Sequence, residues 1–136
     1  MSSLVIDASA FVYVATSTEP EAAKSRTMMD RVVCHAPHLI DAEVGNVLRR
    51  HELAGRITPG VAATGLRLLR HLVDERYPAT GPLGEAAWRL RGSITFYDAL
   101  YVALANMLGA KLVTGDARLT RAPGLPCEVE LVRAGR

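Results

Sequence analysis

The sequence predicts an α/β protein built on a short, mainly parallel central sheet with helices on both faces. Two observations support this prediction. Short apolar runs typical of buried strands alternate with longer segments of helical spacing. The 136 residues are 49% hydrophobic but only 5% aromatic, so one domain over residues 1–136 must fill its core with Ala, Val, Leu and Ile.

Five strands are predicted, each from a short run of apolar or β-branched residues. In chain order they are residues 4–6, 31–34, 77–80, 111–114 and 128–132. The third is predicted to be a weak edge strand, because Pro78 cannot donate a hydrogen bond to a neighbouring strand. The last alternates between polar and apolar residues, which is typical of a strand with one exposed face.

Six helices are predicted between these strands. In chain order they are residues 8–15, 19–30, 39–54, 58–74, 83–91 and 97–108. Pro20 and the pair Thr58-Pro59 are typical of helix starts, and Gly55 and Gly109 are typical of helix ends. The last helix is apolar nearly all round, so we expect it to be buried.

Composition and charge restrict the possible functions. The apolar runs are shorter than the roughly 18 residues of a membrane span, and the N-terminus does not resemble a secretory signal. Cys34 and Cys127 stand alone, so we expect two reduced thiols in a cytoplasmic protein.

The formal net charge is +2, but all of the 16 basic residues except Lys24 and Lys111 are Arg, which suits phosphate binding. A genomic preference for Arg codons explains the same count equally well.

Four acidic residues stand where solvated carboxylates are unexpected. They are Asp7, Glu43, Asp98 and Asp116. Asp7 and Asp116 follow predicted strands, Asp98 begins the buried helix, and Glu43 borders an apolar helix face. Asp41 is turned from Glu43 by about 200° around the helix and suits the first turn instead. Local explanations stay open: helix caps or turns for Asp7 and Asp116, a capping box with Thr95 for Asp98, and a salt bridge for Glu43.

The carboxyl ends of parallel strands meet at one edge of such a sheet, where ligands bind. Carboxylates gathered there repel one another unless a cation neutralises them. A hard divalent ion does so with oxygen ligands alone. We interpret the four histidines as surface or capping residues of a loop and of helices, which argues against zinc. They are His35, His38, His51 and His71.

Four segments, in order, resemble the PIN-domain ribonucleases and most closely the VapC-type toxins of bacterial toxin–antitoxin pairs. They are VIDASA at 5–10, EVGNVLRR at 43–50, YDALYVALA at 97–105 and LVTGD at 112–116. The resemblance implies a three-layer α/β/α sandwich and hydrolysis of RNA phosphodiesters by Mg²⁺ or Mn²⁺ held on the four acids. It also implies a homodimer and a small antitoxin protein as partner.

The resemblance also implies supporting residues. Ser9 and Thr114 match hydroxyl positions that support the site, although capping of strand ends explains them equally well. Asp98 or Asp116 is the candidate to orient or deprotonate the attacking water. Basic residues near the matching segments are candidates for holding RNA phosphates, with a solvated helix face as the alternative. They are Arg49, Arg50, Arg89, Arg91 and Arg118.

Two other enzyme classes fit the sequence poorly. An aspartyl-phosphate phosphotransferase needs a second acid two residues after the first strand's Asp, and here that position holds Ser9. A dinucleotide enzyme needs a glycine-rich turn there, and residues 7–10 contain no glycine. The remaining alternative is a non-catalytic module of the same fold that binds nucleic acid or protein.

Overall fold

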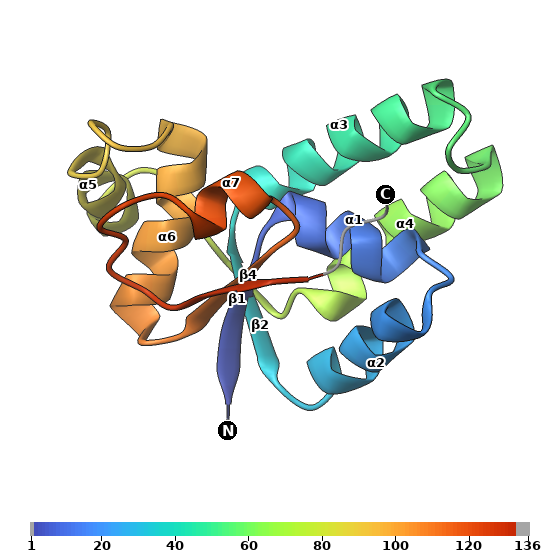
Figure 1. The fold of residues 1–136 in the computed structure, drawn as a ribbon, viewed down its shortest axis with the longest axis horizontal. Helices are drawn as coiled ribbons and strands as arrows, with labels where there is room; N and C mark the ends of the chain where they lie inside the picture. The colour runs from blue at the N-terminus through green and yellow to red at the C-terminus, as the bar shows by residue number, and fades with distance from the viewer. Residues whose placement is uncertain (1, 133–136) are drawn as a thin grey trace.

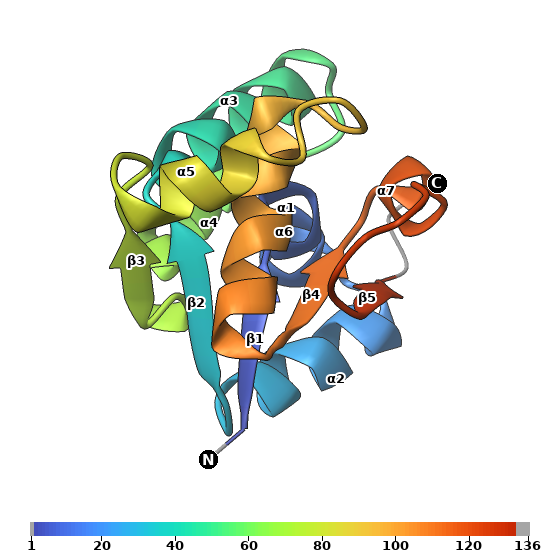
Figure 2. The ribbon, with the colours of Figure 1, turned by 90° about the vertical axis from the view of Figure 1, so that its left-hand side faces the viewer.

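The computed structural model describes residues 2–132, and within them a five-stranded, entirely parallel sheet forms the centre. The strand order across the sheet is β3-β2-β1-β4-β5 (Figure 2). The strands are β1 (Ser3–Ile6), β2 (Val33–Pro37), β3 (Glu75–Tyr77), β4 (Lys111–Thr114) and β5 (Val129–Leu131). The predicted parallel sheet is therefore confirmed.

Helices cover both faces of this sheet. They are α1 (Ala8–Thr16), α2 (Pro20–Met29), α3 (Leu39–Leu53), α4 (Pro59–Leu72), α5 (Pro82–Trp88), α6 (Phe96–Leu108) and α7 (Ala117–Thr120). Figure 1 views the sheet along its edge, with α5 and α6 on one side and α1 to α4 on the other. Helix α6 packs on β1, β2 and β4, while α1 packs on α2, α3 and α4. The predicted three-layer α/β/α sandwich is confirmed.

The apolar sequence of α6 explains its central place. Every residue from Ala99 to Ala105 is buried, as predicted from its apolar circumference. Thr95 begins the helix, because its side chain accepts a hydrogen bond from the Asp98 N–H, and Gly109 ends it in the left-handed conformation with φ +63°. Helix α6 begins at the end of the sheet where β1 and β4 finish (Figure 2), and Asp98 lies in its first turn.

Three elements differ from the sequence prediction. The second strand lies at Val33–Pro37 rather than 31–34, and the third at Glu75–Tyr77 rather than 77–80. His35 is therefore in a central strand and only 8% exposed, so its placement in a surface loop was wrong. Its Nδ1 lies 2.8 Å from the Tyr77 hydroxyl, which satisfies the buried ring. The short helix α7 was not predicted.

Further sequence expectations concern membranes and cysteines. None of the helices in residues 2–132 is both long and apolar enough to cross a bilayer. Cys34 is buried in β2 and Cys127 is half-buried, and both thiols are free. Burial raises the pKa of Cys34 to about 12, so this thiol stays protonated at neutral pH.

Candidate active site

Asp7 is the most deeply buried of the four predicted acids, with 8% of its surface exposed. It directly follows β1, and its N–H donates to the Val113 carbonyl of β4 at 3.1 Å. Its carboxylate also caps α1, because Oδ1 accepts hydrogen bonds from the Ala10 N–H at 2.9 Å and from the Ser9 hydroxyl at 2.8 Å. The cap that the sequence offered as an alternative is therefore present, and it fixes the carboxylate at the end of the central strand.

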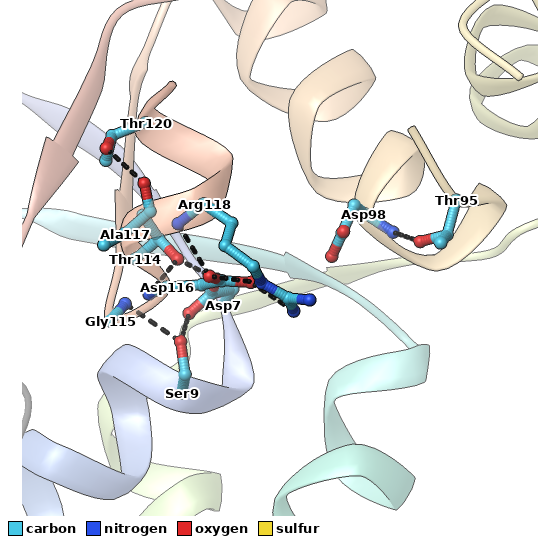
Figure 3. A network of polar contacts seen from close by, with 10 residues as sticks. All are labelled: Asp7, Ser9, Thr95, Asp98, Thr114, Gly115, Asp116, Ala117, Arg118 and Thr120. Atoms are coloured by element: carbon cyan, nitrogen blue, oxygen red, sulfur yellow. Dashed lines mark hydrogen bonds and ion pairs between the residues drawn. The ribbon is translucent and has the colours of Figure 1, made fainter. Parts of the chain in front are cut away.

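Two hydroxyls connect Asp7 to the loop after β4 (Figure 3). Thr114 Oγ1 donates to Asp7 Oδ2 and accepts from the Asp116 N–H at 3.0 Å. Ser9 Oγ accepts from the Gly115 N–H at 2.9 Å. A Cβ atom on Gly115 would lie 3.1 Å from Ser9 Oγ, so glycine permits this close approach. Its φ is not positive, so its backbone conformation does not require glycine.

Two further carboxylates reach the same region from opposite faces of the sheet. Asp98 lies in the first turn of α6, and within residues 2–132 it forms no ion pair. Glu43 lies on α3 and accepts a hydrogen bond of 2.6 Å from the Tyr101 hydroxyl. Tyr101 is buried one helical turn after Asp98, so both side chains project from one face of α6. A single helix thus presents one acid and positions another.

Asp116 differs from the other three because it has a cationic partner. It caps α7, and its Oδ1 accepts from the Arg118 N–H at 2.9 Å. Its Oδ2 lies 3.1 Å from Arg118 Nη2. The Arg118 hydrogen bond holds the pKa of Asp116 below its usual value. In Figure 3 the Arg118 side chain extends from Asp116 toward Asp98.

The other three acids bind protons more tightly than ordinary carboxyl groups. Burial is the main cause of the raised pKa of Asp7, Glu43 and Asp98. Neighbouring charges add to it: Asp98 raises the pKa of Asp7, both of them raise that of Glu43, and Asp116 raises that of Asp98. Asp98 therefore lies close enough to each of the other three acids for their charges to interact.

A groove of about 550 Å³ opens beside Asp98 and Asp116, and Arg91 and Arg118 line it. Two of the five predicted arginines thus flank this acidic groove. The remaining three are exposed and lie outside its lining; they are Arg49, Arg50 and Arg89. A phosphate-binding role for all five stays a prediction.

The side chains suit a hard divalent cation. Among residues 2–132, no three His, Cys, Asp or Glu side chains are close enough to form a complete metal site by themselves. Mg²⁺, however, is usually held by one or two carboxylates and completes its shell with water and substrate phosphate. The four acids and two hydroxyls offer oxygen donors only, and three of the acids form no ion pair with any residue from 2 to 132. Ligation by Asp7, Glu43, Asp98 and Asp116 stays a prediction.

Comparison with known proteins decides the family. The PIN domain matches residues 4–125, which include all four acids. The chain belongs to the PIN-domain family. Ribonuclease VapC1 of Mycobacterium tuberculosis is 47% identical over 133 residues, which cover 98% of this chain and 100% of that protein.

Solved PIN-domain structures agree with the fold. The VapBC2 structure from Rickettsia felis, bound to a DNA fragment from its promoter, matches with a TM-score of 0.69 and 14% identity over 95% of this chain and 98% of that one. VapBC-5 from Mycobacterium tuberculosis, of the VapBC family of toxin–antitoxin systems, matches with a TM-score of 0.58 and 20% identity over 98% and 100%. At these identities the two matches show the shared fold.

Two features of this PIN domain bear on how well the sequence predicted its site. Tyr101 was not singled out, although a hydroxyl in a helix that is apolar nearly all round signals a buried hydrogen-bond partner. Asp41 lies in the first turn of α3, as predicted, and binds Arg76 at 2.9 Å. Glu43 instead shares its surroundings with Asp7 and Asp98.

Proposed function

We propose that this chain is an endoribonuclease that hydrolyses RNA phosphodiester bonds with Mg²⁺ or Mn²⁺ held by Asp7, Glu43, Asp98 and Asp116. The main support is the group of carboxylates at the carboxyl ends of the central strands that form no ion pair in the described part of the chain. The full-length similarity to Ribonuclease VapC1 supports RNA as the substrate.

In this proposal, the protein positions the carboxylates before any ligand arrives. Ser9 and Thr114 hold Asp7, so its oxygens need little reordering. Tyr101 holds one oxygen of Glu43 and leaves the other available. A bound divalent ion would neutralise the charge that develops on the phosphoryl oxygens during an in-line displacement.

Asp98 is the better candidate to orient the attacking water and accept its proton. Its raised pKa suits a general base more than that of an ordinary carboxylate does. Asp116 suits that role less, because Arg118 stabilises its ionised form. Arg118 and Arg91 line the groove beside these acids, where guanidinium groups can hold the substrate's phosphates. We assign more distant phosphate contacts to Arg49, Arg50 and Arg89.

We further propose that the protein is the toxin of a toxin–antitoxin pair, acts as a homodimer in the cytoplasm and is neutralised by a small antitoxin. The support is the likeness to VapC1, to VapBC2 and to VapBC-5, the last of which is described as a member of the VapBC family of toxin–antitoxin systems. The free Cys34 and Cys127 agree with a reducing compartment.

Conditional expression of the wild type and of Asp98→Asn tests the proposal. We expect growth arrest with discrete new RNA ends for the wild type and neither effect for the variant. Purified wild type should cut the same RNA only with Mg²⁺ or Mn²⁺. Asp41→Asn is the matched control, because Asp41 is an acid on α3 that Arg76 already neutralises. Undiminished cleavage in excess chelator, or by Asp98→Asn, would contradict the proposal.

A further inference from the structure

Aromatic side chains are exposed next to the acidic groove, at the end of α5 and the start of α6. Trp88 is 57% exposed and Phe96 37% exposed, and their rings meet edge to face with centroids 6.2 Å apart. The guanidinium carbon of Arg91 lies 4.7 Å from the centre of the Trp88 ring. Large aromatic side chains left this open on a protein surface commonly mark a binding site.

These two rings line a second hollow of about 460 Å³. Small residues form much of the rest of its lining, including Ala79 and Gly84. A side chain at Gly84 would collide with the Ala79 carbonyl, so the close packing of these two residues depends on glycine. The surface left open between the rings and these small residues suits a flat, apolar group.

The second hollow adjoins the acidic groove. Arg91 lines the groove and also covers part of the Trp88 ring that lines the hollow. Thr95 lines the groove, and the next residue, Phe96, lines the hollow. A ligand chain leaving the groove therefore passes Arg91 and reaches the two aromatic rings.

We propose that Trp88 and Phe96 stack an unpaired nucleobase of the RNA whose phosphodiester occupies the acidic groove. This inference rests on the proposed ribonuclease function. Flat rings beside guanidinium groups suit single-stranded RNA, because the bases stack on the rings while the cations hold the backbone. Arg89 and Arg91, one and three residues after Trp88, supply those cations, since Arg89 lines the hollow and Arg91 lines the groove. The enzyme thereby selects cleavage sites that lie next to an unpaired base.

Trp88 is the only tryptophan of the chain, so its fluorescence reports on this surface alone. The full chain carrying Asp98→Asn, which leaves RNA uncut, is titrated with a single-stranded RNA of roughly ten nucleotides. An abasic chain of the same length and charge and a blunt RNA duplex serve as comparison ligands. We expect saturable quenching by the single strand alone. Equal quenching by the abasic chain, or none by the single strand, would overturn the proposal.

Binding of fluorescently labelled single-stranded RNA measures the contribution of the ring. Trp88→Ala should weaken it by roughly tenfold to a hundredfold, the range for loss of one stacked base, whereas Trp88→Phe should retain most of it. Leu53→Ala is the matched control, because Leu53 is 68% exposed and is the last residue of α3, a helix that lies on the other side of the sheet from α5 and α6 (Figure 1). Unchanged binding by Trp88→Ala would overturn the proposal. A Trp88 emission that shifts with protein concentration in the absence of RNA would also overturn the proposal, because a second copy of the chain would then cover the ring.

The two hypotheses fail in different ways. If the wild type cuts no RNA with Mg²⁺ or Mn²⁺ although the Trp88 results appear as expected, the nuclease function is wrong and the stacking surface stands. If Asp98→Asn abolishes cleavage while Trp88→Ala binds and cuts RNA like the wild type, the nuclease function stands and the stacking surface is wrong.

Discussion

Acidic side chains at the two edges of the sheet differ from those above its middle in whether they form ion pairs. Near the β3 edge, Asp41 pairs with Arg76 at 2.9 Å, and at the β5 edge, Glu130 pairs with Lys111 at 2.8 Å. Above the middle strands, Asp7 and Glu43 accept hydrogen bonds from hydroxyls. Neither they nor Asp98 form an ion pair within the described residues.

The proposed function accounts for this difference, because acids that receive a cation need no Arg or Lys beside them. The chain places Arg and Lys beside acids at the edges, where the pairs face solvent. Burial instead disfavours the charged forms of the middle acids, and these acids also repel one another. Such an arrangement destabilises the protein without its ligand and is typical of functional sites.

The largest expected effect is the loss of cleavage when a middle acid is neutralised. Asp7→Asn keeps a side-chain oxygen that can cap α1 but removes the negative charge at the end of β1. We expect the cleavage rate to fall by about a hundredfold or more, in the range of a lost catalytic group. Single-turnover cleavage of the mapped RNA measures this. A cleavage rate near that of the wild type would contradict the assigned role of the middle acids.

A second prediction concerns the buried thiol of Cys34, which stays uncharged because it keeps its proton. Cys34 is buried in β2, with a pKa raised from 9.0 to about 12. Below the unfolded pKa its thiol is neutral in both states. As the pH rises from that value toward the folded pKa, only the unfolded state ionises, so stability falls by about 1.4 kcal/mol per pH unit.

Chemical denaturation at pH 8, 9 and 10 in excess chelator measures this loss. Cys34→Ala should be less stable at pH 8, because it leaves a small cavity, but should lose less stability between pH 9 and 10. Equal pH slopes for the two proteins would show that Cys34 ionises without unfolding. Cys34 would then not be a case of charge avoided by burial.

A third prediction concerns the stability cost of the middle acids. Without divalent ions, Asp98→Asn should stabilise the fold by roughly 1 kcal/mol, because it removes repulsion with Asp7 and Asp116. Mg²⁺ should raise the Tm of the wild type and raise that of the variant less. Calorimetry with and without Mg²⁺ measures both effects. If Asp98→Asn were less stable than the wild type in chelator, the Asp98 carboxylate would stabilise the fold through a partner in the protein and would not be a free cation ligand.

The sequence predicted strands β1, β4 and β5 better than β2 and β3. Strands β1 and β4 were found because their apolar runs end at a polar residue, and the same rule pointed to Asp7 and Asp116. The second strand was misplaced because His35 is polar, and its burial depends on Tyr77, which lies 42 positions later. Side-chain partners brought together by folding are not encoded in local spacing.

The same reasoning explains which parts of the site could be predicted. Asp98 was identified because a charge in an apolar helix is conspicuous in the sequence. The pairing of Glu43 with Tyr101 joins α3 to α6 across 58 positions, and it became visible only in the folded chain. The arginine that neutralises Asp116, by contrast, lies two positions away and is a local contact.

The smallest expected effect belongs to the β3 edge. Asp41→Asn removes one partner of a partly exposed ion pair, so stability should fall by only about 0.5 kcal/mol. Arg76 also donates to the carbonyls of Val73 and Leu69, so it stays satisfied in the variant. RNA cleavage should be unchanged, because the Asp41 carboxylate already has its cation. If Asp41→Asn lost activity as Asp7→Asn does, an ion pair would not distinguish structural acids from catalytic ones in this fold, and the edge would belong to the active site.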